Sequence, residues 1–405
     1  MKRILIYTII VASLLLAACG GGAETATEPI ATEVQATEPS AATEAPATES
    51  PATEAPGATE APTEAPTGGT AERCGDTSQL AEEIFLYNWS DYLDPAIKDQ
   101  FEAECGVKVT ETNYDSNETL LATLQAGGAD YDIVVPSDYM VQILISEGML
   151  MELDYSAIPN MDHMDEVNLN TYFDPDQKYT VPYFWGTSGF AVDTSVVTDY
   201  TDSWSMMFDP DSPYCGQISM LDDQRETLGA ALMYLGYSIN DTDPAHLEEA
   251  KNLLIEQSKC VKAYDSETNG DLLVAGETVL AHIWTGAAIL ASLERPEIVY
   301  VIPKEGTTIW QDNLAIPVSA PNPYTALVFI NYLSDPEIAA QNTEYIAYAS
   351  PNKTAKEIID PSMLSETVYP TGEMASRLQW IEDVGDALEL YDRVWTEFKA
   401  AIGQQ

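Results

Sequence analysis

Short apolar strands alternate with amphipathic helices through most of the chain, and this alternation limits the folds open to it. Residues 84–89 read as a strand, and Asp94-Pro95 then supplies a helix N-cap and a proline at the first helical position. Strands at 107–114 and 132–135 follow, separated by a helix that Asn117 caps. This pattern predicts a parallel sheet with helices on both faces.

The same rhythm returns after Trp185 and continues toward the C-terminus. We expect further strands at 190–192, 218–221, 261–264, 279–284, 298–302 and 314–317. We expect helices at 226–235, 244–257, 270–275, 287–293 and 386–400, and after the capped starts at Ser137, Asn322-Pro323 and Asp335-Pro336. About 325 residues are enough for two α/β lobes. Ligands bind beyond the carboxyl ends of the strands in such sheets, so two lobes would share a cleft.

Residues 1–18 have the composition of an export signal. Lys2 and Arg3 precede an apolar run at 4–16, and Ala17-Ala18-Cys19 supplies a small-residue cleavage site. A permanent transmembrane helix would need roughly 20 apolar residues. The segment 16–19 also resembles the bacterial lipobox, which implies that lipid on Cys19 anchors the protein to the membrane. We therefore expect an extracytoplasmic lipoprotein, at the cell surface or on the periplasmic face.

Residues 20–72 repeat Ala, Thr, Glu and Pro and contain no aromatic residue, Lys or Arg. Such a segment cannot build a core, so we predict that 19–72 form the lipid anchor and a disordered stalk. Its ten glutamates explain only a small part of the formal net charge of −49, so the remainder is strongly acidic. An acidic surface repels nucleic acid and attracts cations, and nucleic acid is not expected as a partner.

Four cysteines follow Cys19 in a compartment where disulfides persist. Three pairings are open, and we favour Cys74–Cys105 and Cys215–Cys260 because each pair then lies within one structural half. Their spacings match no zinc pattern, and the chain has only three histidines. We therefore expect no metal site and no cofactor.

Aromatic residues and carboxylates recur where the predicted strands end, at 88–92, 136–139, 222–226, 282–284, 309–312 and 345–348. Carboxylates pair with ammonium groups, while Trp and Tyr faces hold cations and methylene chains, with cation–π energies of about 2 kcal/mol or more when desolvated. This combination suits an alkyl di- or triamine. Amino acids or sugar acids would instead need a positioned arginine, and arginine is scarce after residue 72: Arg73, Arg225, Arg295, Arg377 and Arg393.

Six segments, in this order, resemble the spermidine/putrescine-binding proteins of polyamine ABC importers: Tyr87-Asn88-Trp89-Ser90-Asp91-Tyr92, Ser116-Asn117-Glu118-Thr119, Asp132-Ile133-Val134-Val135-Pro136-Ser137, Pro182-Tyr183-Phe184-Trp185-Gly186, Pro303-Lys304-Glu305-Gly306 and Leu314-Ala315-Ile316-Pro317. The resemblance covers residues 80–400. It implies a type II periplasmic-binding-protein-like fold, in which each lobe is a mainly parallel sheet flanked by helices. Lobe 1 would comprise 80–187 and 311–357, and lobe 2 would comprise 188–310 and 358–405, with a hinge between them.

The resemblance also implies a monomer without catalysis that captures a polyamine between its lobes and delivers it to an ABC permease in the membrane. Carried over by motif, one wall of the site would contain Trp89, Ser90, Asp91, Tyr92, Ser137 and Tyr139. Asp223 and Glu226 would meet amines from the opposite lobe, and Trp284 and Trp310 would sandwich the methylenes. Asp312 would pair with another amine, and Tyr348 would close the site.

Two positions depart from the family pattern and leave the choice of polyamine open. Putrescine-preferring members carry an acid where this chain has Ala287, and spermidine-preferring members carry an amide where it has Ile381. Glu382 is a candidate substitute for that amide. We favour spermidine over putrescine.

Other functions remain as alternatives. A secreted hydrolase would use paired carboxylates, but the chain lacks the serine-elbow, zinc-protease and phosphate-loop motifs. His282 is read as a packed strand residue. A binder of another cation, such as thiamine, would use similar aromatic and acidic residues. Asp174-Pro175-Asp176 and Asp209-Pro210-Asp211 lack the spacing of a calcium loop and are read as turns.

Overall fold

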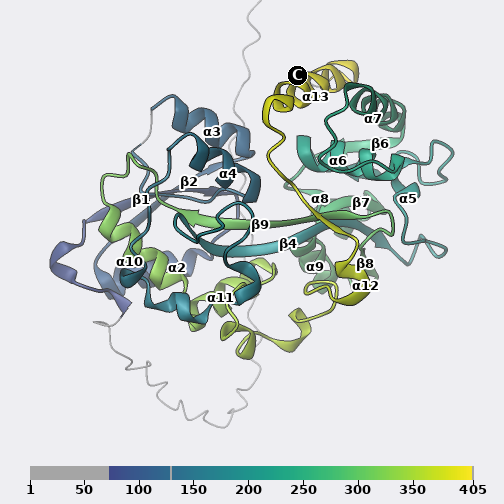
Figure 1. The fold of residues 1–405 in the computed structure, drawn as a ribbon. Coiled ribbons are helices and arrows are strands. Elements are labelled where there is room, and N and C mark those ends of the chain that lie inside the picture. The colour runs from purple at the N-terminus through teal and green to yellow at the C-terminus, as the bar shows by residue number, and fades with distance from the viewer. Residues whose placement is uncertain (1–72, 128–129, 404–405) are drawn as a thin grey trace, which may run out of the picture. The chain divides into compact units, whose positions relative to one another are not determined.

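The computed structural model describes residues 73–127 and 130–403, all within one compact unit of the chain. The predicted signal peptide, Cys19 and the stalk lie outside the described residues. Within these ranges, ten strands form one connected sheet flanked by helices (Figure 1). No helix in the same ranges is both long and apolar enough to cross a membrane.

The first half of the sheet contains three parallel strands, β1 (Glu83–Trp89), β2 (Lys108–Tyr114) and β3 (Ile133–Val134). The helices beside them are α2 (Pro95–Cys105), α3 (Asn117–Gln125), α4 (Asp138–Ser146), α10 (Pro323–Leu333) and α11 (Pro336–Ile346). Asp94 caps α2 by accepting from the Ala96 N–H, and Gly106 ends it at a φ of 72°. Apolar side chains from distant segments, such as Ile84, Phe101 and Phe329, form its core.

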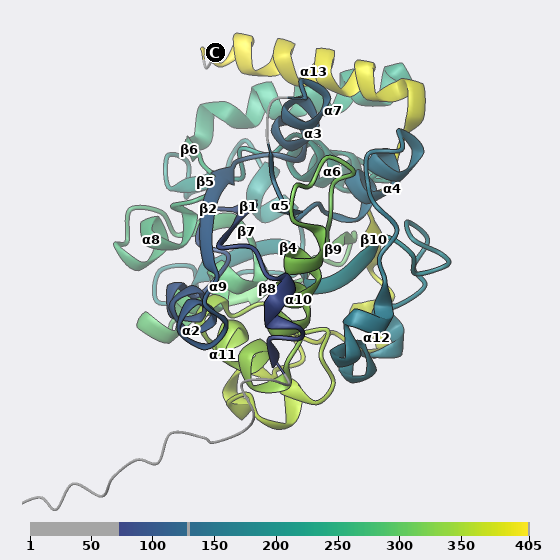
Figure 2. The ribbon, with the colours of Figure 1, turned by 90° about the vertical axis from the view of Figure 1, so that its left-hand side faces the viewer.

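The second half contains β5 (Ile218–Met220), β6 (Val261–Tyr264) and β7 (Leu280–Trp284), in which β5 pairs parallel with both neighbours. The antiparallel strand β8 (Ile298–Val301) also belongs to it. Its helices are α5 (Ser205–Phe208), α6 (Gln224–Leu235), α7 (Pro244–Gln257), α8 (Asn269–Val274), α9 (Thr285–Glu294), α12 (Gly372–Ala375) and α13 (Leu388–Ala401). The last of these packs along α7 and α6 (Figure 2), and Tyr391 and Phe398 join the core with Phe190.

Two long strands, β4 (Thr180–Asp193) and β9 (Thr307–Ala315), run across the middle and belong to both halves (Figure 1). They pair antiparallel with each other over Thr180–Thr187, and from Ser188 onward β4 pairs with β7 and β8. At its other edge β9 pairs with β3 and with β10 (Leu378–Trp380), which is parallel to it. The α/β class is therefore as predicted, but antiparallel crossing strands make the sheet mixed rather than mainly parallel.

The strands predicted from the sequence at 190–192 and 314–317 cover only one end of β4 and of β9, so both predicted strands are too short. Pro182, Gly186 and Gly189 interrupt the apolar pattern of β4, and residues of these types normally indicate turns. In the structure β4 accommodates the proline at a register shift between Pro182 and Phe184. Single turns of 3-10 helix complete the described secondary structure: Thr77–Gln79, Tyr155–Ala157, Pro159–His163, Glu166–Asn168, Ser258–Cys260, Ala355–Glu357, Pro361–Met363 and Gly385–Ala387.

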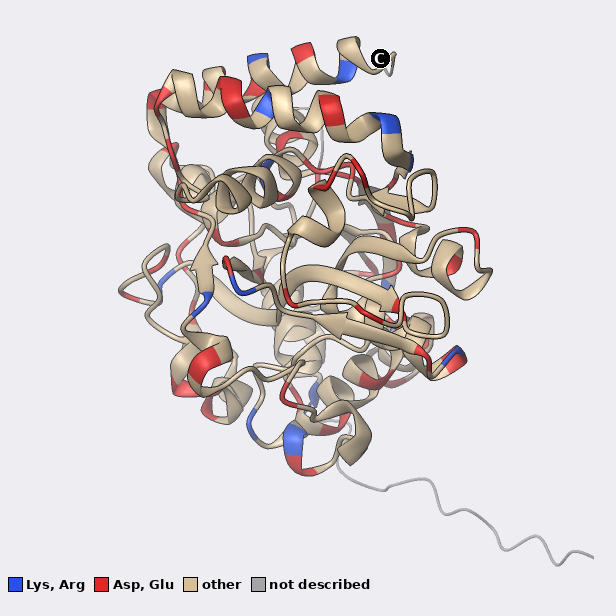
Figure 3. Ribbon diagram, turned by 90° about the vertical axis from the view of Figure 1, so that its right-hand side faces the viewer, with Lys and Arg blue, Asp and Glu red and all other residues tan. Residues whose placement is uncertain are grey.

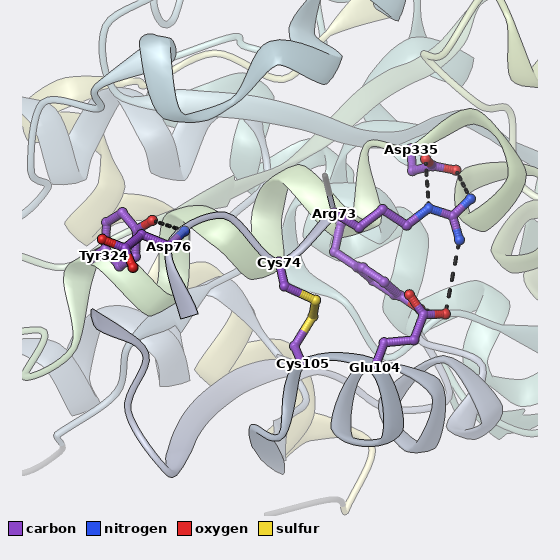
Figure 4. Close-up of a disulfide and its surroundings, with 8 residues drawn as sticks. Arg73, Cys74, Asp76, Glu104, Cys105, Tyr324 and Asp335 are labelled. Carbon is purple, nitrogen blue, oxygen red and sulfur yellow. Dashed lines mark hydrogen bonds and ion pairs between the residues drawn. A yellow bond between two sulfur atoms is a disulfide. The ribbon is translucent and has the colours of Figure 1, made fainter. Parts of the chain in front are cut away.

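Both favoured disulfides are present, Cys74–Cys105 and Cys215–Cys260. The first fastens residues 73–79, here called the N-terminal clamp, to α2 (Figure 4). Arg73 also donates to Asp335 at 3.1 Å, and the Asp76 N–H donates to the Tyr324 hydroxyl at 2.8 Å. Gly75 lies at a φ of 58° against that hydroxyl, so only glycine fits between them. The clamp is thus held by α2, α10 and α11 of the first half.

Candidate functional site

Alternate residues of β9 form one face of the site. Thr308, Trp310 and Asp312 are two positions apart and therefore lie on the same face of the strand. The Thr308 hydroxyl donates to Glu226 at 2.7 Å. Gln311 lies on the opposite face and accepts from the Asn168 amide at 2.9 Å. Trp310 and Asp312 therefore share one strand face with Thr308, the residue that contacts Glu226 of the second half.

Asp312 is buried beneath two hydroxyl donors. The Tyr92 and Ser137 hydroxyls each donate to its carboxylate at 2.6 Å. Ser137 stands at the N-cap position of α4 but does not cap the helix, because its hydroxyl is directed to Asp312. The Asn117 amide donates to the same hydroxyl at 3.1 Å, while Ser116, not Asn117, caps α3. Burial raises the pKa of Asp312 to about 6, although the two hydroxyl hydrogen bonds oppose the shift.

Glu226 is the corresponding carboxylate of the second half and is 5% exposed. It lies in the first turn of α6, where the Asp223 side chain caps the helix by accepting from the Glu226 N–H at 2.9 Å. Besides Thr308, the Ser188 hydroxyl donates to it at 2.6 Å and the Trp284 indole N–H at 3.3 Å. Burial, reinforced by the charge of Asp223, raises the pKa of Glu226 to about 7.

Aromatic rings pack around these two carboxylates. The ring centroids of Trp310 and Tyr348 are 5.0 Å apart and those of Tyr92 and Tyr348 are 5.6 Å apart, both edge to face. Two glycines make room for the rings, because a Cβ atom on Gly186 would lie 2.6 Å from Trp310 and one on Gly286 would lie 2.7 Å from Tyr348.

Two further acidic residues, Asp138 and Glu118, lie beside predicted ligand residues but were not themselves among the residues predicted from the sequence. Asp138 is fully buried at the start of α4 and accepts from the Gln311 N–H at 3.2 Å, and burial raises its pKa well above the usual range. Glu118 accepts from the Tyr139 hydroxyl at 3.1 Å. Burial is the main cause that raises the pKa of Glu118 to about 7, and the negative charge of Asp223 adds to it. Glu118 stands in a motif quoted above and Asp138 directly follows another, and both lie in the first turn of a helix, where acids are favoured.

The structure therefore gathers most of the predicted ligand residues, including Tyr92, Ser137, Tyr139, Asp223, Glu226, Trp284, Trp310, Asp312 and Tyr348. It leaves Ser90 and Asp91 exposed in the turn after β1. Trp89 is half-buried against Tyr114 and donates its indole N–H to the Val135 carbonyl at 3.0 Å. A role of these three residues in binding stays a prediction.

Cations are scarce around these carboxylates. Asp and Glu outnumber Lys and Arg over the ribbon (Figure 3). Burial raises the pKa of Glu118 and of Asp223, and the charge of Arg225, on α6, opposes both shifts. Within the described residues, the donors to the Asp138, Glu226 and Asp312 carboxylates are hydroxyl, indole and backbone N–H groups, and none is a cationic side chain.

The alternative sites suggested by the sequence have structural roles. His282 is buried in β7 against Trp204, and burial lowers its pKa to about 3, as expected of a packed strand residue. The Asp174 carboxylate accepts from the N–H groups of Lys178, Tyr179 and Thr180, which makes it the organiser of a turn. Across 73–127 and 130–403, no group of three or more His, Cys, Asp or Glu side chains is arranged to hold a metal. A cavity in the first half is lined by Met164, Tyr183, Asn342 and others, none of them a predicted ligand residue.

Comparison with known proteins gives consistent matches over the folded part. Residues 96–368 match the family described as bacterial extracellular solute-binding protein. The chain is 39% identical over 325 residues to the spermidine/putrescine-binding periplasmic protein of Escherichia coli (strain K12), covering 78% of this chain and 91% of that protein. It is 30% identical over 333 residues to the putrescine/cadaverine-binding protein of Pseudomonas aeruginosa, covering 79% and 94%.

The fold is also similar to those of solved bacterial proteins. The spermidine/putrescine ABC transporter substrate-binding protein of Streptococcus pneumoniae is similar with a TM-score of 0.67 and 32% identity, over 80% of this chain and all of that one. A lipoprotein of Treponema pallidum is similar with a TM-score of 0.69 and 29% identity, over 78% and 99%.

Proposed function

The chain belongs to the bacterial extracellular solute-binding proteins, among the spermidine/putrescine-binding members, and on this basis we propose that it captures a polyamine outside the cytoplasm for an ABC importer. Membership of this family agrees with the expectation of a binding protein rather than an enzyme. The relatives named above bind spermidine, putrescine or cadaverine according to their names, so the class of ligand is shared while the preferred polyamine differs.

The observation that carries the proposal is the group of inner carboxylates, Asp138, Glu226 and Asp312. All three are buried, and their raised pKa values reflect the cost of holding negative charge away from water. Ammonium groups would compensate these charges. The rings of Trp284, Trp310 and Tyr348 offer apolar surface to the methylenes that join such groups. A polyamine supplies both in one flexible molecule.

The crossing strands support a hinge. The proposed lobe boundaries at 187/188 and 310/311 fall within β4 and β9, and β4 changes partners between Thr187 and Ser188. Tyr92 and Asp312 come from the first lobe, whereas Glu226 and Trp284 come from the second. A ligand that bridges the two sets stabilises the closed arrangement, because only that arrangement makes both sets of contacts.

We propose spermidine as the preferred ligand. Asp138 adds a third inner carboxyl, which matches the three amines of spermidine better than the two of putrescine. Ala287 supplies no additional acid at the position where putrescine-preferring relatives carry one.

Substitutions at the site test the proposal. Asp312→Asn removes a buried charge that would pair with an amine, and truncating one partner of such a pair costs about 3–5 kcal/mol. Trp310→Ala removes the ring against the methylenes. We expect each variant to weaken spermidine binding roughly tenfold or more by calorimetry, with an unchanged circular dichroism spectrum. Asp211→Asn, an exposed aspartate, is the matched control. Unchanged affinity in both site variants would contradict the assignment of the site.

The ligand class itself is tested by thermal shift with putrescine, spermidine, spermine, thiamine and ferric ion. We expect the polyamines to raise the unfolding temperature, because a ligand that binds only the native state stabilises it. A shift with thiamine alone would replace the polyamine proposal with the other cation-binding function.

We further propose that lipid on Cys19 anchors the protein to the outer face of the cytoplasmic membrane, close to its permease. The lipobox-like segment at 16–19 supports this anchor, and a structurally similar protein of Treponema pallidum is named a lipoprotein.

A further inference from the structure

One arginine lies at the outer end of the acidic site. Arg225 follows Asp223 by two residues in α6 and is 1% exposed. Its guanidinium donates to the Glu382 carbonyl at 3.1 Å and to the Asn240 side chain at 2.8 Å. It lies 5.3 Å from the ring centroid of Tyr139 and 4.8 Å from that of Tyr391. Two hydrogen bonds and two rings therefore hold the charge in a fixed place.

The carboxylates form a connected series that ends beside this arginine. Asp312 and Thr308 share one face of β9, and the Thr308 hydroxyl donates to Glu226 at 2.7 Å. The Glu226 N–H donates to Asp223 at 2.9 Å. Asp223 in turn interacts with Glu118, whose carboxylate accepts from Tyr139. Glu118 and Asp223, the outer pair, are half-buried, and the Arg225 guanidinium lies beside Tyr139, the ring that contacts Glu118. The side-chain hydrogen bonds of Arg225 go to Glu382 and Asn240 and to none of the three inner residues.

We propose that Arg225 is a built-in cation that occupies the outer end of the site and limits the number of ammonium groups that a ligand can place there. A diamine or triamine uses the inner carboxylates, Asp138, Glu226 and Asp312. A longer tetraamine would direct its next ammonium toward Asp223 and Glu118, where the guanidinium already supplies positive charge. Like charges in a desolvated site repel, so the extra amine gains little or loses affinity. Arg225 is thus a specificity-determining residue against tetraamines, and this inference rests on the proposed function.

The test compares putrescine, spermidine and spermine by calorimetry on the full mature chain. In the unaltered protein we expect spermine, despite its additional charge, to bind no more tightly than spermidine. Arg225→Gln keeps donors for Glu382 and Asn240 but removes the charge, and we expect it to raise the spermine-to-spermidine affinity ratio roughly tenfold. Arg225→Lys retains a cation and should leave the ratio within about threefold of the original.

Arg377→Gln is the matched control, because it changes the net charge equally while altering a surface ion pair with Asp202 and Glu373. It should leave the ratio unchanged. Adding Glu118→Gln to Arg225→Gln should remove most of the gain in spermine binding, because that gain requires the outer carboxylate.

Each outcome decides between the two proposals. An unchanged ratio in Arg225→Gln, with spermidine still bound, overturns the role of Arg225 and leaves the proposed function standing. Failure of the unaltered protein to bind any polyamine overturns the proposed function and this inference with it. If Arg225→Gln does not fold, the unaltered protein still decides, because spermine binding roughly tenfold tighter than spermidine would contradict a closed outer end.

Discussion

At the scale of single residues, Glu226 shows how burial couples the site to pH. Its carboxylate has three side-chain donors, yet burial still raises its pKa to about 7. The folded protein therefore holds a proton there that the unfolded chain, with an ordinary glutamate pKa, releases at lower pH. The resulting stabilisation is complete below the unfolded pKa and is lost as pH rises through about 7. A cationic ligand reverses this loss, because it favours the ionised carboxylate.

We predict that the ligand-free protein gains stability at about pH 8 when Glu226 is replaced by Gln, by up to roughly 3 kcal/mol, with a smaller gain near pH 5. The neutral amide avoids the cost of burying a charge. Denaturant unfolding at the two pH values measures the difference. Glu389→Gln, an exposed glutamate on α13, is the matched control. An equal effect of Glu226→Gln at both pH values would show that this carboxylate does not titrate in the window.

Asp138 shows why part of the site escaped the sequence analysis. Asp312 and Glu226 were predicted by resemblance to a family, and the structure buries both next to other predicted ligand residues. Asp138 directly follows Ser137, the last residue of a quoted motif, but only the contact between α4 and β9 places it beside the predicted ligand residues. That contact joins positions far apart in the sequence, and local patterns carry no information about it.

At the scale of secondary-structure elements, local signals located the helices well and the crossing strands poorly. The Asp-Pro pairs at 94–95 and 335–336 do open helices, with the aspartate as the cap in each. In contrast, β4 and β9 are defined by pairing with each other across more than a hundred residues of sequence, and β4 is buried along nearly its whole length. Neither alternation nor turn residues mark such strands.

Close packing of elements also positions the aromatic side chains. Gly286 lies in the first turn of α9 against the ring of Tyr348. We predict that Gly286→Ala weakens polyamine binding roughly tenfold, because the added methyl group displaces this ring. Alanine is the better helix former, so a loss of affinity cannot come from helix propensity.

A double-mutant cycle checks this prediction by calorimetry. In a Tyr348→Ala background, where the ring is absent, Gly286→Ala should have little further effect. Equal losses in both backgrounds would mean that the methyl group disturbs something other than Tyr348.

At the scale of the whole molecule, the acidic composition would attract cations, and the proposed anchor would keep the protein at the membrane. The formal net charge of −49 draws polyamines toward the protein at low ionic strength. We predict that Cys19→Ala releases a protein that still binds polyamine into the soluble fraction and lowers polyamine uptake by cells. Membrane fractionation and uptake of labelled spermidine measure the two effects. If the protein is released and uptake stays unchanged, polyamine import does not depend on the lipid anchor.

The N-terminal clamp determines which lobe the predicted stalk would be attached to. Cys74 is bonded covalently to α2, Arg73 donates to the N-cap of α11, and the Asp76 N–H donates to Tyr324 of α10. All three partners belong to the proposed first lobe, so the stalk would be attached to that lobe. The second lobe is joined to the first by its crossing strands and not by the clamp. We therefore propose that on a tethered molecule the first lobe stays close to the anchor, while the second lobe moves when the site opens and closes.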